Sequence, residues 1–413
     1  MRVAVPKEIR AGEKRVALVP DIINKLTRLG LDVSIESGAG THSQATDADY
    51  TTAGATVKQG DVLADADVVL SVQPLTAQQM ATLKKGAITI SFLSPVTAVD
   101  SIEAAASAGV TAFSLELVPR ISRAQSMDAL TSQALCAGYR AALVGAELSP
   151  RFFPVLMTAA GTVTPAQVLV LGAGVAGLQA IATARRLGAV VSAYDVRPSS
   201  ADEVKSMGAT FIDLELEALE GAGGYAREMT EERAAKQREL LTPYIAKSHL
   251  VITTAAVPGR AAPRLMTAAM IDAMEAGTII VDLAAETGGN AEGSKPGEIV
   301  TTAKGVQIWG GKDVPSQLPF HASSLYSRNV VNLLTLMTSA AKDGEKVALN
   351  IDFTDEIIDK AALTHAGAKH TPGASEKGAS TEWMHLPFSQ SSRLQDSWGL
   401  TWLQRFHQRY TRP

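Results

Sequence analysis

The stretch Val168-Leu169-Val170-Leu171-Gly172-Ala173-Gly174-Val175-Ala176-Gly177 decides the fold of this chain. Four consecutive apolar residues are typical of a strand that is buried on both faces. The three glycines follow at the spacing of a tight turn from a strand into a helix, which we expect to run to Leu187. Gly188 then ends the helix, and Ala189–Tyr194 reads as the next strand. The stretch therefore predicts a β-α-β unit of a parallel sheet.

A turn of this kind suits the pyrophosphate of a dinucleotide. Gly172 permits the tight turn, Gly174 lets the backbone approach the pyrophosphate, and Gly177 allows close packing of helix on strand. The helix N-terminus offers free N–H groups to the phosphates. Asp195, at the end of the next strand, is the acid expected to bind the adenosine ribose hydroxyls. Arg197 would suit a 2′-phosphate, but Asp195 is the nearer determinant, so NAD(H) is favoured over NADP(H).

Short apolar runs alternate with helix-length amphipathic segments along the chain to about residue 340. The alternation predicts an α/β fold with two doubly wound, Rossmann-like subdomains. The expected strands are Arg2–Val5, Asp32–Glu36, Asp67–Val72, Ala87–Phe92 and Val110–Ser114 in one set, and Val168–Leu171, Val190–Tyr194, Thr210–Ile212, Leu250–Thr253, Thr278–Val281 and Val306–Trp309 in the other.

We expect three regions. The first subdomain is discontinuous, 1–130 plus 310–365, and the dinucleotide-binding subdomain is 131–309. A helix at Thr131–Leu148 bridges them, and a second at roughly Ser323–Lys342 returns the chain to the first subdomain. The tail, 366–413, is rich in Gly, Ser, His and Pro and then aromatic, so it reads as poorly ordered or as an interaction segment.

Composition excludes several classes of function. A net charge of −4 over 413 residues gives no electrostatic case for binding nucleic acid or an anionic membrane. The single cysteine, Cys136, excludes an internal disulfide and fits a reducing compartment. Residues 1–8 lack the apolar core of a signal peptide, and no run reaches the ~18–20 apolar residues that a spanning helix needs. We therefore expect a cytoplasmic chain with no membrane span.

A second polar motif lies upstream, in Arg120-Ile121-Ser122-Arg123-Ala124-Gln125-Ser126-Met127-Asp128-Ala129. It follows a strand-like segment and Pro119, which is where α/β proteins place ligand-binding groups. Arg120, Gln125, Asp128 and Thr131 offer the donors and acceptors that a nicotinamide carboxamide needs. The alternative is a solvated helix N-terminus with an Arg–Asp ion pair, which we prefer for Arg123 alone.

Two further strand ends belong to the dinucleotide-binding subdomain. The small residues Thr253-Thr254-Ala255-Ala256 end one strand and would fit beside a cofactor. Asp282 ends another, before Gly288-Gly289-Asn290, where it is either a ligand contact or a turn cap. Residues 213–230 hold acidic residues and then Gly221, Gly223, Gly224 and Tyr225, which reads either as a lid or as a surface loop.

These residues carry a family resemblance over about residues 1–350. The chain closely resembles the soluble NAD(H)-binding domain of the alpha subunit of proton-translocating NAD(P) transhydrogenase. The resemblance rests on Val5-Pro6-Lys7-Glu8, the run Arg120–Asp128 and Val314-Pro315-Ser316. It implies a homodimer in which two subdomains hold NADH in a cofactor cleft between them.

The resemblance also implies a reaction. A hydride would pass from NADH directly to NADP+ held by an NADP(H)-binding partner component, coupled to proton movement through a membrane-spanning component. The chain would then be peripheral to the inner (plasma) membrane through its partner.

The resemblance further assigns roles to residues. The loop with Arg120, Gln125 and Asp128 would embrace the nicotinamide, and Gln125 would reach toward the partner's NADP(H). Thr131 stands where the family often has serine, which keeps the hydroxyl. Tyr225 beside Gly224 matches the tyrosine of a mobile loop. Positions that match the family's cofactor contacts are Ala173, Gly174, Val175, Asp195, Val196, Arg197, Gly224 and Ala255.

Two alternatives remain. The first subdomain also resembles alanine dehydrogenase, but Gln73 and Ser94 stand where that reaction uses a lysine and a histidine. Neither side chain can act as a cationic clamp or proton relay at neutral pH. An NAD-binding sensor without turnover is the other alternative. The polar run argues against it, because a sensor needs to grip only the adenosine and phosphates.

Overall fold

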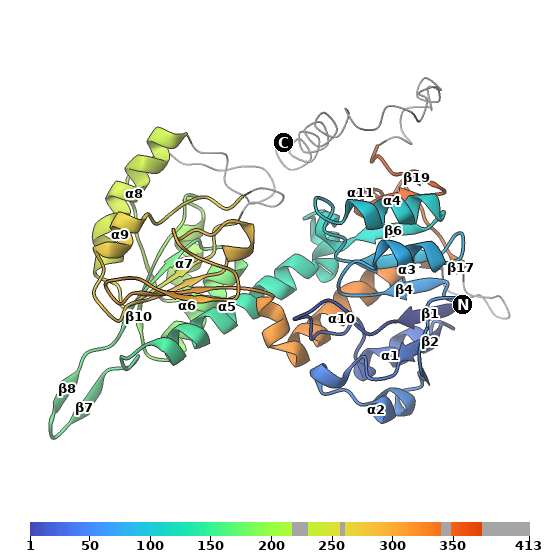
Figure 1. Ribbon diagram of the computed structural model, residues 1–413, viewed down its shortest axis with the longest axis horizontal. Coiled ribbons are helices and arrows are strands. Elements are labelled where there is room, and N and C mark those ends of the chain that lie inside the picture. Colours follow the sequence, from blue (N-terminus) through green and yellow to red (C-terminus); the bar gives the residue numbers. More distant parts are fainter. Residues whose placement is uncertain (217–229, 257–260, 340–347, 374–413) are drawn as a thin grey trace. The chain divides into compact units, whose positions relative to one another are not determined.

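The computed structural model describes residues 1–216, 230–256, 261–339 and 348–373. The chain divides into two compact units (Figure 1). Unit 1 contains Met1–Gln133 and the described chain from Pro315 onward, and unit 2 contains Ala134–Val314. The long helix α5 (Ala129–Leu148) carries the chain from one unit into the other, and Cys136 is buried on it.

Unit 1 is built on a sheet of eight strands among the described residues, in the order β19-β18-β6-β5-β4-β1-β2-β3. The pairings from β6 to β3 are all parallel, and β18 and β19 add an antiparallel edge. The strands are β1 (Arg2–Val5), β2 (Asp32–Glu36), β3 (Thr56–Lys58), β4 (Val68–Leu70), β5 (Ile88–Ser91), β6 (Thr111–Ser114), β18 (Ala362–His365) and β19 (Ala368–Lys369). The helices are α1 (Pro20–Thr27), α2 (Asp47–Thr52), α3 (Ala77–Thr82), α4 (Val99–Ser107), α10 (Pro319–Leu336) and α11 (Glu356–Ala361).

The C-terminal part of unit 1 corrects two expectations. Residues 366–369, expected to begin a tail that is poorly ordered or an interaction segment, form the turn and the second strand of a hairpin, whereas 374–413 lie outside the described residues. Ala366 and Gly367 both have positive φ, 48° and 90°, as a two-residue hairpin turn requires. Helix α10 ends at Leu336 rather than near Lys342, because Thr338–Ser339 (β16) pairs with Ala348–Leu349 (β17).

Unit 2 is built on a second sheet, in the order β11-β10-β9-β12-β13-β15-β14. All its pairings are parallel except that of β14 with β15. The strands are β9 (Gln167–Leu171), β10 (Val190–Tyr194), β11 (Thr210–Phe211), β12 (Leu250–Thr253), β13 (Ile279–Asp282), β14 (Ile299–Thr301) and β15 (Gln307–Gly310). The helices after α5 are α6 (Val175–Arg186), α7 (Ser200–Ser206), α8 (Glu231–Ala246) and α9 (Ala268–Asp272). A hairpin that the sequence did not predict, β7 (Leu156–Thr158) with β8 (Gly161–Val163), projects from this unit (Figure 1).

Alternate residues of the central strands enter two different cores. Val168 and Val170 pack with residues of α5 and α6, whereas Leu169 and Leu171 pack with residues of α8 and α9. The sheet of unit 2 is therefore covered on both faces, which explains its continuous apolar runs. The prediction of an α/β fold with Rossmann-like parallel sheets is confirmed. No helix within the described ranges is long and apolar enough to cross a lipid bilayer.

Candidate functional site

The turn after β9 has little room for side chains. Gly172 has φ +104°, and its N–H donates to the Tyr194 carbonyl at 2.8 Å. A Cβ on Gly172 would lie 2.6 Å from Thr254 Oγ1, and a Cβ on Gly177 would lie 1.9 Å from the Gly172 carbonyl oxygen. Real Cβ atoms do not approach that closely, so packing alone requires both glycines.

Gly174 is a different case. It precedes α6, where its φ of −74° is open to any residue, and a Cβ there would meet nothing within 4 Å. The backbone at the start of α6 is therefore approachable on this side. Because the first amides of a helix lack intrahelical acceptors and its dipole is positive there, this cradle fits a phosphate group.

Asp195 and Arg197 form one ion pair rather than two opposing determinants. Asp195 Oδ2 accepts from the Ala173 N–H (2.7 Å) and Arg197 Nη2 (3.0 Å). Its Oδ1 accepts from the Arg197 N–H and Nε, both at 2.9 Å. The side chains are 8% and 19% exposed. Because a carboxylate has about four acceptor positions, a ribose hydroxyl must replace one of these four bonds. Val196, between them, packs partly against the core.

The end of β12 is tied to the glycine turn and to a buried asparagine. Thr254 Oγ1 donates to the Gly172 carbonyl at 3.0 Å. The Ala255 N–H donates to Asn290 Oδ1 at 3.0 Å, and Asn290 Nδ2 donates back to the Ala255 carbonyl at 2.8 Å. Asn290 is fully buried. The sequence predicted Ala255 as a cofactor contact but not that Asn290 holds it. The glycine pair before Asn290 was the only sequence feature that could have pointed to this role.

Asp282 is a turn cap. Its Oδ1 accepts from Thr253 Oγ1 and the Ala284 N–H, both at 3.0 Å, and its Oδ2 accepts from the Ala291 N–H at 3.1 Å. The residue has no exposed surface. Of the two roles that the sequence left open, the structure therefore supports the structural one.

The polar run 120–128 of unit 1 contains a 3-10 helix, Ser122–Met127. Ala124 and Met127 are buried in the core of the unit, so they anchor the run. Arg120 and Gln125 are exposed. Within the described part of the chain, the Gln125 side chain makes no hydrogen bond. Its amide therefore remains available to a ligand.

Asp128 and Arg123 of the run bond to neighbouring side chains and backbone. Asp128 caps α5, because its carboxylate accepts from the Thr131 N–H at 2.8 Å and Thr131 Oγ1 at 2.6 Å. Arg123 pairs with Asp355 through two hydrogen bonds of 2.6 and 2.9 Å. The ion pair expected for Arg123 therefore exists, with Asp355 and not with Asp128. Tyr225 and Gly224, the residues of the expected lid, lie outside the described residues.

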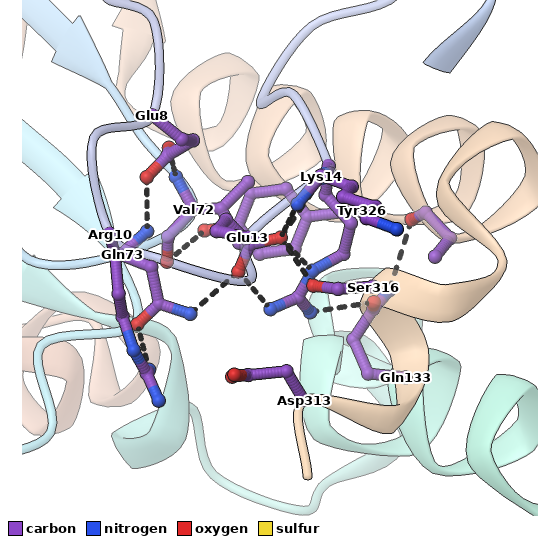
Figure 2. Close-up of polar contacts among 12 residues, drawn as sticks. Glu8, Arg10, Glu13, Lys14, Val72, Gln73, Gln133, Asp313, Ser316 and Tyr326 are labelled. Atoms are coloured by element: carbon purple, nitrogen blue, oxygen red, sulfur yellow. Dashed lines mark hydrogen bonds and ion pairs between the residues drawn. The ribbon is translucent and has the colours of Figure 1, made fainter. Parts of the chain in front are cut away.

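Unit 1 contains a buried ionic network that the sequence did not predict (Figure 2). Glu13 Oε2 lies 2.6 Å from Arg15 Nη2, with side-chain exposures of 0% and 6%. Ser316 Oγ donates to Glu13 Oε1 at 2.6 Å, and Gln73 Nε2 donates to Glu13 Oε2 at 2.7 Å. Burial by itself raises the pKa of Glu13, but the bonds and charge of Arg15 outweigh it and bring this pKa to about 2. Glu13 is therefore a buried carboxylate that stays ionised.

The same network includes Gln73, which stands where alanine dehydrogenase would have a lysine. Gln73 is buried, and its carbonyl oxygen accepts from Arg10 Nη1 at 2.8 Å while its amide serves Glu13. Ser94, the other substituted position, has φ +44°, and its N–H donates to the half-buried Glu116 at 2.9 Å. Burial raises the pKa of Glu116.

Glu8 completes the network at the end of β4. Its carboxylate accepts from the N–H groups of Val72 (2.6 Å) and Gln73 (3.3 Å). Burial raises the pKa of Glu8 to about 7, although these backbone bonds oppose the rise. The strand ends of unit 1 are thus lined by carboxylates in different electrostatic states.

Known proteins match both units. Residues 4–137 match the family described as alanine dehydrogenase/PNT, N-terminal domain, and residues 141–372 match its C-terminal domain. The first part of the NAD(P) transhydrogenase alpha subunit of Rhodospirillum rubrum is 46% identical over 389 residues, which cover 92% of this chain and 100% of that protein. Alanine dehydrogenase of Mycobacterium tuberculosis is 34% identical over 301 residues, covering 72% of this chain and 76% of that one.

A solved structure agrees with these matches. The crystal structure of transhydrogenase from Sinorhizobium meliloti superposes with a TM-score of 0.81 at 45% identity, covering 89% of this chain and all of that one. The transhydrogenase relatives are matched over a larger share of this chain, and at higher identity, than the alanine dehydrogenase. The chain belongs to the alanine dehydrogenase/PNT family and within it is similar to the alpha subunits of NAD(P) transhydrogenase.

Proposed function

We propose that this chain is the NAD(H)-binding component of an NAD(P) transhydrogenase. It would pass a hydride from NADH to NADP+ held by a partner component. The observation that carries the proposal is the match along the full length of the first part of a transhydrogenase alpha subunit, together with a glycine turn that fits a dinucleotide. In the full complex, which includes a membrane-spanning component, the transfer would be coupled to proton translocation.

Unit 2 supplies the groups that would hold the adenosine half of NAD(H). The backbone of Ala173, Gly174 and Val175 would bind the pyrophosphate, since Gly174 leaves that side approachable. Asp195 would accept a ribose hydroxyl after Arg197 gives up part of its pairing. Ala255, held by Asn290, would lie beside the cofactor.

The polar run of unit 1 would serve the nicotinamide. Bound NADH supplies a hydride, which is two electrons and a proton, so NAD+ remains and NADP+ becomes NADPH. The protein has only to orient the rings and exclude water. Arg120 and Gln125 are exposed and Asp128 keeps acceptor capacity beyond its bonds to Thr131. We propose Gln125 as the group nearest the partner's NADP(H).

We further propose that the chain works as a homodimer. The β7–β8 hairpin and the segment before it expose large apolar side chains: Met157 is 82% exposed, Phe152 62% and Val155 53%. Several large apolar side chains exposed within one short segment are typical of an interface. A second copy of this chain would cover it, and light scattering on Met157→Asp against the wild type tests this.

The test of function is hydride transfer in a mixture. The purified chain is combined with an NADP(H)-binding component of a related transhydrogenase, loaded with an NADP+ analogue whose reduced form absorbs apart from NADH. Reduction of the analogue by NADH that requires both proteins would support the proposal. NADH fluorescence checks loading, and Gln125→Asn should slow transfer while NADH binding is kept.

Two other results would count against the proposal. Activity with pyruvate and ammonium, without the partner, would indicate an alanine dehydrogenase despite Gln73. NADH binding without transfer to any of several partner components would favour the sensor.

A further inference from the structure

The polar run 120–128 bears its functional side chains on a short 3-10 helix, which is a weak scaffold because its hydrogen bonds are poorly aligned. Two buried side chains, Ala124 and Met127, fix it from below. Hydride transfer tolerates little misplacement of the groups that orient the rings. The polar contacts that hold the backbone next to Gln125 therefore bear directly on transfer.

Helix α10 supplies those contacts. Asn329 Nδ2 donates to the Ser126 carbonyl oxygen at 2.9 Å, and Asn332 Nδ2 donates to the same oxygen at 3.1 Å. Because a carbonyl oxygen has two lone pairs, these two amides use both of them. Ser126 directly follows Gln125, so its peptide carbonyl fixes the chain one residue from the proposed reactive end.

Asn329 also bonds Ser132 in α5, on the C-terminal side of Asp128. Its Oδ1 accepts from Ser132 Oγ at 2.7 Å, and Ser132 Oγ accepts from Gln133 Nε2 at 3.1 Å. Gln133 in turn accepts from Arg15 Nη1 at 2.9 Å and donates to the Ala322 carbonyl at 3.1 Å.

One continuous chain of hydrogen bonds therefore runs from the Ser126 carbonyl to the buried Glu13–Arg15 pair, part of which is drawn in Figure 2. Asn329 is 7% exposed and Gln133 5%. Hydrogen bonds in such a low-dielectric setting are strong and reinforce one another.

We propose that Asn329 is a positioning residue for hydride transfer, acting through the backbone of the run that bears Gln125 and Asp128. The inference rests on the proposed function of that run and adds to it a residue about 200 positions away that touches no reacting atom. Asn332 assists from the exposed side, where its Oδ1 also accepts from Lys25 Nζ at 2.7 Å.

The decisive variant is Asn329→Asp. It keeps the shape and the acceptor for Ser132, but it replaces the donor to the Ser126 carbonyl with an oxygen that repels it. We expect transfer at saturating NADH to fall about tenfold, because the Ser126 carbonyl loses one of its two donors and faces a repelling oxygen in its place. The dissociation constant for NADH should stay within about twofold, since unit 2 supplies the adenosine site. Amide exchange of residues 120–128 should accelerate.

Thr335→Val is the matched control on α10. Among the described residues, the Thr335 hydroxyl bonds only within its own helix, to the Val331 carbonyl at 2.6 Å, so its loss perturbs the helix and not the run. Ser132→Ala is the second variant, for use if Asn329→Asp does not fold, because it leaves the donor of Asn329 intact and removes the next bond of the chain. It should accelerate exchange in the run to a smaller extent.

Two results would overturn the inference: exchange in 120–128 that matches the Thr335→Val control, or a transfer rate that matches it. Failure of the proposed function is recognised separately, because the wild-type protein itself would then transfer no hydride. Exchange would still decide in that case whether Asn329 holds the run.

Discussion

Strands β1 and β9 occupy the same place in their sheets, each between two parallel neighbours, yet the chain that follows them differs in chemistry. After β9 come glycines and backbone amides, with approachable space at Gly174. After β1 comes a loop whose Glu8 and Glu13 point their carboxylates at the neighbouring strand end and at Arg15. An anionic pyrophosphate would meet amides and a positive helix end in unit 2, and carboxylates in unit 1.

The difference shows that strand order does not make a dinucleotide site. Both sheets have a switch point, where α/β folds bind ligands, but unit 1 fills its own with a buried ion pair and its partners. A buried ion pair adds little net stability, but removing one partner is costly because the other charge stays buried without a counter-charge. Four variants test this difference between unit 1 and unit 2.

The largest effect should come from Arg15→Met in unit 1. It leaves Glu13 buried and unpaired, so the free energy of unfolding should fall by about 3–5 kcal/mol. Urea denaturation followed by circular dichroism measures this. The control is Arg2→Met, which breaks the exposed pair with Asp65 and should cost at most about 1 kcal/mol. Equal losses for the two variants would refute the role given to the pair.

Gly177→Ala should come next, in unit 2. Its Cβ would lie 1.9 Å from the Gly172 carbonyl oxygen, so helix and turn must move apart. We expect a loss of about 3 kcal/mol, at the upper end for overpacking. A melting temperature equal to that of the wild type would show that the turn yields more easily than its contacts suggest.

Gly174→Ala should instead leave stability nearly unchanged and weaken NADH binding. Its Cβ meets no protein atom within 4 Å, so stability should change by less than about 0.5 kcal/mol. The methyl group would nevertheless occupy the approach to the backbone, and NADH should bind about tenfold more weakly, or about 1.4 kcal/mol. Fluorescence titration measures this, and unchanged affinity would move the pyrophosphate away from Gly174.

The smallest effect concerns pH. The pKa of Glu8 is raised to about 7 in the fold, so its ionisation opposes folding and stability should fall as pH rises from about 4.5 to 7. Because Glu8 is partly exposed, we expect only about 1 kcal/mol. Glu8→Gln should remove this fall, which denaturation at pH 4.5 and pH 7 detects. A variant that follows the wild-type profile would assign the fall to other groups.

Local patterns predicted much of the fold and little of the network. The run from Val168 to Gly177 contains strand, turn and helix start within ten residues, so its structure could be read directly. The β7–β8 and β18–β19 hairpins were missed because their short strands mix polar and apolar residues and lack the continuous apolar runs that marked the other strands.

The polar contacts were missed because their partners lie far apart in sequence. The sequence carries no signal for the buried pair of Glu13 and Arg15, because Gln73 and Ser316, which bond Glu13, lie 60 and 303 residues away from it. Likewise, nothing in the sequence distinguishes Asn329 from the other polar residues of α10, because the Ser126 carbonyl to which it donates lies 203 residues away. The cofactor-binding roles of the polar run and the glycine turn stay predictions, which the Gln125→Asn and Gly174→Ala variants test.

The single cysteine gives the linking helix a built-in reporter. Cys136 is 3% exposed on α5, the helix that joins the two units. A thiol reagent can reach it only when the surrounding structure opens, so its alkylation rate in excess reagent measures how often that happens. The chain carries no second thiol to obscure the signal. Slower alkylation on adding NADH would show, without any substitution, that cofactor binding makes opening of the structure around α5 less frequent.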